Sequence, residues 1–365
     1  MVGVVGCSGG ADDVKQPTDT TTSPTFALAV LHGQVDVLGD AGDGLHGPTD
    51  LAFDPDDPGT LWVVSRDDDS VTRYAQAGEP DQQAEHIVDP YALHFMEQVS
   101  SIAFGAPGRF ATCQDSRNTY DGSRSPNDFM GPTLWSSDPA VFGVSNPDAV
   151  AFLSAQYGFH VDLGSHLDML HETPLCRGIA WEADNVYWVF DGADDALARV
   201  DFRQDHGPGY DDHSDGVVER WVEGEVARQG SLASHLEYDP QTAELFVADT
   251  GNGRIAVLDT TTGARGADLP TKEPGTEHYQ WEGAVLTTLV DTAAIGLEAP
   301  VGLALIDDLV FVTDAGGTVA AFDRTGAEVD RVDLGRPGLS GIVARSAGEL
   351  WLVDREAGEL LRLTK

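Results

Sequence analysis

Short apolar runs, separated by turns rich in Gly, Asp, Asn and Pro, follow one another along most of the chain. The clearest stretch begins at His235. Its apolar runs at 236–238, 245–248 and 255–258 are separated by Asp239-Pro240 and by Gly251-Asn252-Gly253. Short β-branched and apolar runs bounded by such turn residues are typical of strands rather than helices. This stretch therefore predicts three strands joined by two tight turns.

The same phrase recurs six times. The first strands of the copies lie at residues 51–53, 102–104, 179–181, 236–238, 303–305 and 342–344. The second strands lie at residues 61–64, 110–113, 187–190, 245–248, 310–313 and 350–353. A sheet of this size cannot bury both faces alone, whereas packing several sheets around an axis buries them. The repeat therefore predicts an all-β fold, a six-bladed β-propeller.

The ends of the repeat predict how the ring closes. The last copy ends with its third strand near residues 360–363, and a strand-like segment at 35–38 precedes the first copy. We expect this segment to complete the last blade. Residues 1–25 form a separate N-terminal tether in this interpretation, and residues 26–365 form the propeller.

The copy that runs from His235 to Asp259 resembles the repeat of the NHL family, which has a similar strand, an Ala-Asp pair, a Gly-Asn turn and an Arg-Ile start of the next strand. The resemblance covers residues from ~30 onward and implies a six-bladed propeller. It does not imply one function, because propellers host many. In the NHL-like lyase that cleaves peptidyl-α-hydroxyglycine, histidines at inner-strand starts hold a catalytic zinc. Ser234-His235-Leu236 resembles one such segment, but the other strand starts here have no matching histidine.

The charge of the chain excludes some partners. It carries 61 acidic and 21 basic side chains, a net charge of −40. Such a surface repels phosphate backbones and anionic lipids, so we expect no nucleic-acid binding. Two interpretations of the charge stay open: solubility in a salty medium, or binding of cations such as calcium.

The N-terminus and the cysteines predict export. Residues 4–7, Val-Val-Gly-Cys, resemble a bacterial lipobox, and residues 8–25 are rich in Gly, Asp, Thr, Ser and Pro. We therefore expect a secreted or cell-envelope protein, a lipoprotein held to the membrane only through a lipid on Cys7. In an oxidising compartment Cys113 and Cys176 can form a disulfide, and two separate buried thiols are the alternative.

Five histidines precede or begin inner strands, which places them on the face where the central channel opens. They are His46, His94, His166, His171 and His235. Neutral imidazoles that converge there can bind zinc, copper or iron. Carboxylates from the same segments can complete the ligand shell: Asp50, Glu97, Asp168 and Glu172. The alternative is that each histidine is an independent polar loop residue.

Two further residues are candidate catalytic groups. Arg177 lies beside the start of the third inner strand, where it can receive a carboxylate of a ligand or pair with an acidic neighbour. Glu97 precedes the second inner strand. Both are expected at the channel mouth.

Two long segments exceed the repeat, at residues 114–158 and 202–216. The second is rich in Asp, His and Gly, which resembles a calcium loop in composition and also fits an ordered polar turn on the opposite face or the rim. Long loops in a compact β scaffold are often functional.

Two functions remain open from the sequence. One is a monomeric propeller that binds a small molecule, glycan or protein at the channel-mouth face. The other is a metal-dependent lyase or hydrolase. No nucleophile elbow, HExxH or P-loop motif occurs.

Overall fold

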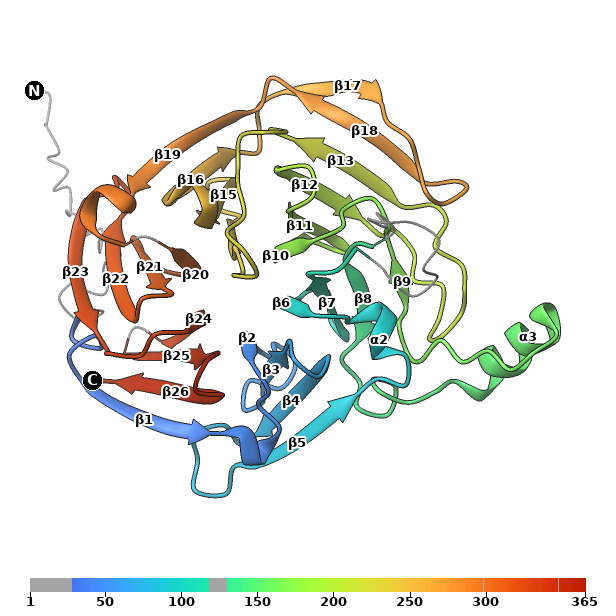
Figure 1. The fold of residues 1–365 in the computed structure, drawn as a ribbon, viewed down its shortest axis with the longest axis horizontal. Coiled ribbons are helices and arrows are strands. Elements are labelled where there is room, and N and C mark those ends of the chain that lie inside the picture. The colour runs from blue at the N-terminus through green and yellow to red at the C-terminus, as the bar shows by residue number, and fades with distance from the viewer. Residues whose placement is uncertain (1–27, 118–129, 298, 347) are drawn as a thin grey trace, which may run out of the picture.

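The computed structural model describes residues 28–117, 130–297, 299–346 and 348–365. Six sheets are arranged around a central axis, with β2, β6, β10, β14, β20 and β24 innermost (Figure 1). The predicted six-bladed β-propeller is confirmed. Residues 4–7 and the tether at 1–25 lie outside the described residues.

The blades follow one another in chain order. Blade 1 contains β2 (Pro48–Phe53), β3 (Leu61–Ser65), β4 (Ser70–Ala75) and β5 (Gln83–Val88). Blade 2 contains β6 (Val99–Phe104), β7 (Arg109–Gln114), β8 (Thr133–Ser136) and β9 (Asp168–Met169). Blade 3 contains β10 (Cys176–Ala183), β11 (Val186–Asp191), β12 (Ala196–Asp201) and β13 (Val217–Trp221).

The second half of the ring has the same order. Blade 4 contains β14 (Leu236–Asp239), β15 (Glu244–Asp249), β16 (Arg254–Asp259) and β19 (Val285–Asp291). Blade 5 contains β20 (Pro300–Ile306), β21 (Leu309–Asp314), β22 (Thr318–Asp323) and β23 (Glu328–Asp333). Blade 6 contains β24 (Leu339–Ser346), β25 (Glu349–Asp354) and β26 (Glu359–Thr364).

The N-terminal strand closes the ring, as predicted. Strand β1 (Gln34–Gly39) pairs antiparallel with β26, with Val35 opposite Leu363 and Val37 opposite Leu361. It forms the outer strand of blade 6 (Figure 1). The first and last segments of the propeller therefore share one sheet.

One hairpin departs from the repeat. Strands β17 (Ala264–Asp268) and β18 (Glu277–Glu282) leave blade 4 between β16 and β19, and β18 pairs in parallel with β13. Blade 3 thereby becomes a six-stranded sheet. The hairpin brings residues from blade 4 to the outer edge of blade 3.

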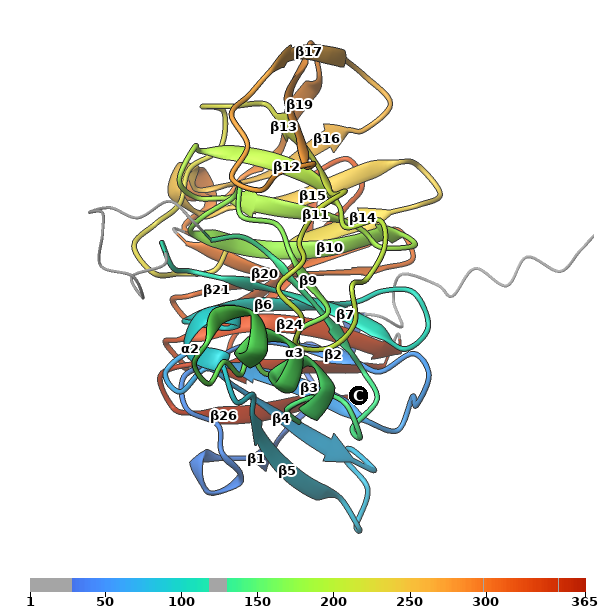
Figure 2. The same cartoon turned by 90° about the vertical axis from the view of Figure 1, so that its right-hand side faces the viewer.

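Helices occur only in connections within the described residues. They are α2 (Ala92–Phe95), α3 (Pro147–Tyr157) and the 3-10 turns η1 (Ala41–Asp43), η2 (Thr250–Asn252) and η3 (Ala293–Ile295). Asn146 caps α3 by accepting the amide N–H of Asp148, and Gly158 ends it with a positive φ of 78°. This helix projects from the rim and faces the viewer in Figure 2. No described helix is long and apolar enough to cross a membrane.

The core consists of apolar layers between neighbouring blades. Five tryptophans are almost fully buried in these layers: Trp62, Trp135, Trp188, Trp221 and Trp351. A disulfide joins Cys113 of β7 to Cys176 of β10, which confirms the predicted pairing. It links the innermost part of blade 3 to blade 2.

In blades 3 to 6 the second strand ends in an aspartate whose carboxylate accepts backbone N–H groups of adjacent loops. Asp249 is fully buried, accepts the N–H of Ala227 at 2.8 Å and pairs with Arg254 at 2.7 Å. We expect Asp249→Ala to lower the free energy of unfolding by about 2 kcal/mol, because it removes the buried acceptor of the Ala227 amide and of the half-buried Arg254 guanidinium. Urea unfolding measures this. The matched control is Asp291→Ala, whose carboxylate is exposed, and equal midpoints for the two variants would contradict the expectation.

Candidate metal centre

Three of the predicted histidines come together, but at the outer rim of blade 2 rather than at the channel mouth. His94 lies on α2, and His166 and His171 flank the short outer strand β9. All three are at most 6% exposed. The prediction of a site at the channel mouth is wrong for them, because the connections that carry them bend outward over the blade edge.

The segment at 202–216 folds against this edge. Its backbone continues the sheet beyond β9: His206 N–H donates to Leu167 O at 3.2 Å, and Gly209 N–H donates to His166 O at 2.8 Å. This brings His213 against His166 and His171. The sequence placed the segment on the opposite face or the rim, and the rim is where it lies.

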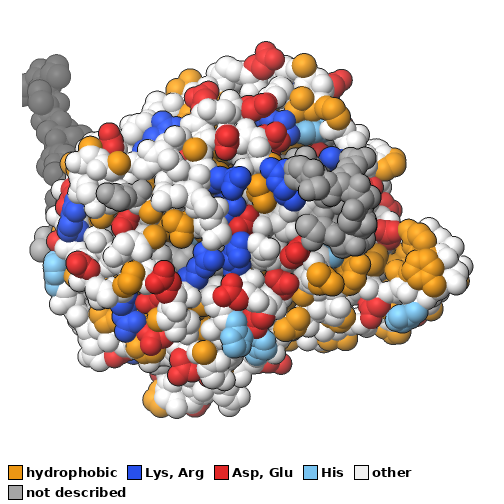
Figure 3. Space-filling view, viewed as in Figure 1, with side chains coloured by type: hydrophobic (Ala, Val, Ile, Leu, Met, Phe, Trp, Pro, Cys, Tyr) orange, Lys and Arg blue, Asp and Glu red, His pale blue; other side chains and the backbone are white. Residues whose placement is uncertain are grey.

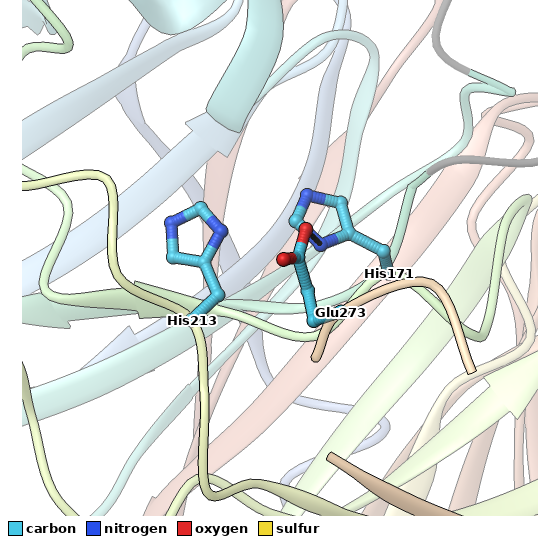
Figure 4. Close-up of side chains that lie close together, drawn as sticks. All are labelled: His171, His213 and Glu273. Atoms are coloured by element: carbon cyan, nitrogen blue, oxygen red, sulfur yellow. Dashed lines mark ion pairs between the residues drawn. The ribbon is translucent and has the colours of Figure 1, made fainter. Parts of the chain in front are cut away.

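The hairpin from blade 4 supplies a carboxylate to the same place. His171, His213 and Glu273 each place a potential ligand atom within 4.8 Å of the others. His171 Nδ1 lies 3.3 Å from Glu273 Oε1, and the three side chains point toward one another (Figure 4). Two imidazoles and a carboxylate form a common donor set for zinc and for non-haem iron.

Hydrogen bonds determine which nitrogen of His213 is available. His166 Nδ1 lies 2.9 Å from the carbonyl of Leu163, which can only accept, so Nδ1 carries the proton. In the neutral ring Nε2 of His166 is then the acceptor for His213 Nε2, 3.1 Å away. His213 therefore donates with Nε2 and keeps a lone pair on Nδ1. A ligand histidine held by such an outer partner is a regular feature of metal sites.

The imidazoles are neutral at neutral pH. Burial is the main cause that lowers the pKa of His94 to about 4, and the neighbouring His213 adds to the shift. Burial and His206 lower the pKa of His213 to about 4. Burial also holds the pKa of His166 and of His171 well below the usual value. Neutral imidazole is the form that binds metals.

A cavity of about 330 Å³ adjoins the cluster. His171, His213 and Glu273 line it together with His94 and Asp211. The rest of the lining is mostly aromatic and apolar: Tyr91, Phe95, Tyr157, Phe159, Val161 and Leu163. Phe159 is 66% exposed, and apolar side chains gather on the projecting lobe in Figure 3.

His235 lies in the central channel, as its place at an inner-strand start predicts. Its Nδ1 is 3.5 Å from Asp50 Oδ1, and its Nε2 is 3.4 Å from Ser100 O. It lines a channel cavity of about 610 Å³ together with Asp50 and Glu237. Burial and the charge of Asp50 raise the pKa of Glu237 to about 8. The other predicted histidines do not line this cavity, so the single five-histidine site is wrong.

The remaining predicted ligands are not members of the cluster of His171, His213 and Glu273. His46 lies on blade 1, 3.8 Å from Asp68, whose carboxylate is also 3.4 Å from His86. Asp168 accepts the N–H of Met169 at 2.7 Å and faces His206 rather than the cluster. Glu172, next to His171, accepts the N–H of Lys272 at 2.8 Å.

The two candidate catalytic residues have internal partners. Arg177 pairs with Asp115 at 2.6 Å. Glu97 accepts a hydrogen bond from the hydroxyl of Ser116 at 2.6 Å. Neither residue lines the rim cavity. Their catalytic roles stay predictions.

Fold and site together define a six-bladed β-propeller with a histidine–carboxylate cluster on its rim. No protein-family model and no curated protein matches the chain. Solved structures show the same fold. Regucalcin from Agrobacterium tumefaciens, described as a calcium-binding protein, has 11% identity and a TM-score of 0.54, covering 91% of this chain and 93% of that one.

Two further structures are similar at the same level. Virginiamycin B lyase from Staphylococcus aureus has 10% identity and a TM-score of 0.51, covering 91% of this chain and 99% of the lyase. An auxiliary nutrient binding protein from Bacteroides thetaiotaomicron has 13% identity and a TM-score of 0.51. The match covers 87% of this chain and 69% of that protein. Likeness at such low identity concerns the fold alone, since one fold serves many functions.

Proposed function

We propose that the protein binds a first-row transition metal through His171, His213 and Glu273, and a small apolar or aromatic molecule in the adjoining cavity. The observation that carries the proposal is the arrangement of two buried neutral imidazoles and one carboxylate within 4.8 Å of one another beside an aromatic cavity. The His166 relay supports it, because it turns the lone pair of His213 Nδ1 away from its outer partner.

The donor set favours zinc, with iron or copper as the other metals that imidazole suits. Three protein ligands leave at least one coordination position for a water or a ligand atom. That position would face the cavity that the three residues line. A bound molecule would then combine a metal-coordinating oxygen or nitrogen with an apolar body against Tyr91, Phe95 and Phe159.

Metal-dependent lyase or hydrolase activity is the second candidate, and the cavity beside the cluster favours it. A metal ion bound there would polarise a carbonyl or lower the pKa of its water toward neutrality. The protein would contribute three ligands and an aromatic wall that positions the substrate. The two candidates separate on product formation: an enzyme converts the molecule it binds, whereas a binding protein returns it unchanged.

Cobalt(II) substitution tests the proposal, because its visible spectrum reports coordination number. We expect cobalt to bind in a 1:1 ratio, and benzohydroxamate, an aromatic metal ligand, to change the spectrum. Phe159→Ala should lower the affinity for benzohydroxamate and leave cobalt binding unchanged. Phe152→Ala, an exposed change on the same lobe outside the cavity lining, is the control. A protein that binds no cobalt would contradict the metal site. A cobalt spectrum that does not change when benzohydroxamate is added would contradict ligand binding in the cavity.

His166 provides a separate prediction. Its ring stacks on Phe95 at a centroid distance of 3.6 Å, so His166→Phe should keep an aromatic ring there and remove the hydrogen bonds to His213 and to the carbonyl of Leu163. We expect zinc affinity to fall about 10- to 100-fold, as for other outer-shell partners. Competition with a chromophoric chelator measures this. An unchanged affinity with an unchanged melting temperature would show that His166 does not orient His213.

We further propose that the protein acts outside the cytoplasm, held by a lipid on Cys7. The buried disulfide between Cys113 and Cys176 supports this, since such bonds persist in oxidising compartments. Fractionation of cells that express the full chain tests it. The chain should sediment with membranes and Cys7→Ser should not, and an equal distribution of the two would contradict the anchor.

A further inference from the structure

Four arginines gather around the mouth of the central channel, away from the rim cluster. Arg66 and Arg355 follow the second strands of blades 1 and 6, Arg177 lies in the innermost strand of blade 3, and Arg228 lies in the connection from blade 3 to blade 4. These positions share one face of a propeller. Figure 3 shows basic side chains grouped near the middle of this face of an otherwise acidic protein.

A single buried carboxylate links two of them. Asp115 pairs with Arg66 at 2.7 Å and with Arg177 at 2.6 Å. Arg177 is only 2% exposed. The Nε atoms of both arginines are buried and have no hydrogen-bond acceptor among the described residues. Buried donors of this kind are rare in proteins and mark a place where an acceptor is missing.

Among the described residues, the other two arginines have no ion pair. Arg355 donates to the carbonyl of Ser231 at 2.9 Å, which connects blade 6 to the segment that carries Arg228 on the far side of the mouth. Neither Arg355 nor Arg228 has a carboxylate within 4 Å in the part of the chain that the structure describes. Asp67 and Glu356 lie close enough to Arg355 to offset part of its charge.

The arginines repel one another. Burial, with a smaller contribution from Arg228, Arg66 and Arg355, lowers the pKa of Arg177 to about 10 despite the attraction of Asp115. Burial and Arg66 likewise lower the pKa of Arg355. An anion placed among them would relieve this repulsion.

We propose that the channel mouth binds a small anion with two or more negative charges, either a dicarboxylate or a phosphate, through Arg66, Arg177, Arg228 and Arg355. Guanidinium groups suit this ligand because their paired N–H donors match the oxygens of carboxylate and phosphate. The site is independent of the rim metal: it uses other residues, other blades and other chemistry.

Titration calorimetry on the full chain with succinate and with inorganic phosphate tests the proposal and distinguishes the two sources. We expect at least one of them to bind more tightly than about 1 mM. Arg228→Gln and Arg355→Gln should each weaken it about tenfold, the loss of one charge-assisted hydrogen bond. Arg331→Gln, an exposed arginine on blade 5, should leave the affinity unchanged.

Both substitutions lie on surface connections, so the melting temperature should stay at the wild-type value and show that the variants fold. Binding of neither anion overturns the proposal. So does binding that survives both mouth substitutions or that falls equally in Arg331→Gln. Because metal content is not needed for any of these outcomes, they leave the rim proposal untouched.

Discussion

Replacing His171 and His213 together by alanine is expected to lower the affinity for zinc by more than about a hundredfold. Loss of an outer-shell partner alone costs about 10- to 100-fold, and this change removes two of the three ligand atoms at the cluster. Glu273 would remain as a lone carboxylate on the hairpin between β17 and β18. Competition with a chromophoric chelator measures the loss.

The matched control is His46→Ala with His86→Ala, a second pair of neighbouring histidines near Asp68 on blade 1. It removes the same number of imidazoles and should leave tight zinc binding unchanged. If the control loses zinc and the His171, His213 variant keeps it, the site has been placed on the wrong blade. Melting temperatures show whether each variant is folded.

Replacing Cys113 and Cys176 together by alanine is expected to lower the free energy of unfolding by about 4 kcal/mol. The two cysteines are 63 residues apart in sequence, and a disulfide that closes a loop of this length restricts the unfolded chain by about that amount. Both side chains are fully buried, so alanine keeps the site apolar. Guanidinium unfolding of the unreduced protein measures the effect.

Reduction provides the control for this prediction. A reducing agent should lower the midpoint of the wild-type protein toward that of the double variant, and it should not affect the variant. Cys7→Ala should behave like the wild type. Equal midpoints for the wild type and the double variant, both unreduced, would contradict a stabilising disulfide.

The fold can be predicted from the sequence because the repeat is local. Each first and second strand, such as 236–238 and 245–248, is an apolar run with its own turn, and a run of this kind specifies a strand without reference to the rest of the chain. The closing strand at 35–38 could be predicted because one blade lacked its fourth strand. Aspartates that end second strands, such as Asp249 and Asp314, accept backbone N–H groups of adjacent loops.

The site was harder to predict because long-range pairing builds it. His94, His166 and His171 were recognised as candidate ligands, but they lie at the rim of blade 2 instead of the channel. His213 and Glu273 were missed as ligands. Their positions depend on the 202–216 segment packing along β9 and on β18 pairing in parallel with β13. Parallel pairing across blades follows no local pattern, and the density of Asp and His in 202–216 was the one available signal.

In the central channel, by contrast, the repeat does predict the position of a candidate residue. His235 was expected to face the axis and does so, since its place at an inner-strand start follows from the repeat. Its neighbours there are Asp50 and Glu237, not further histidines. The repeat can therefore predict which residues face the channel, but not which distant loops meet at the rim.

Elemental analysis of the protein purified without added metal is the sharpest test of metal binding at the rim. We expect close to one zinc, iron or copper ion per chain, retained through buffer exchange and absent from the His171→Ala, His213→Ala variant. A folded wild-type chain that takes up none of these metals, even after they are supplied, would contradict it. So would a metal that the double variant retains.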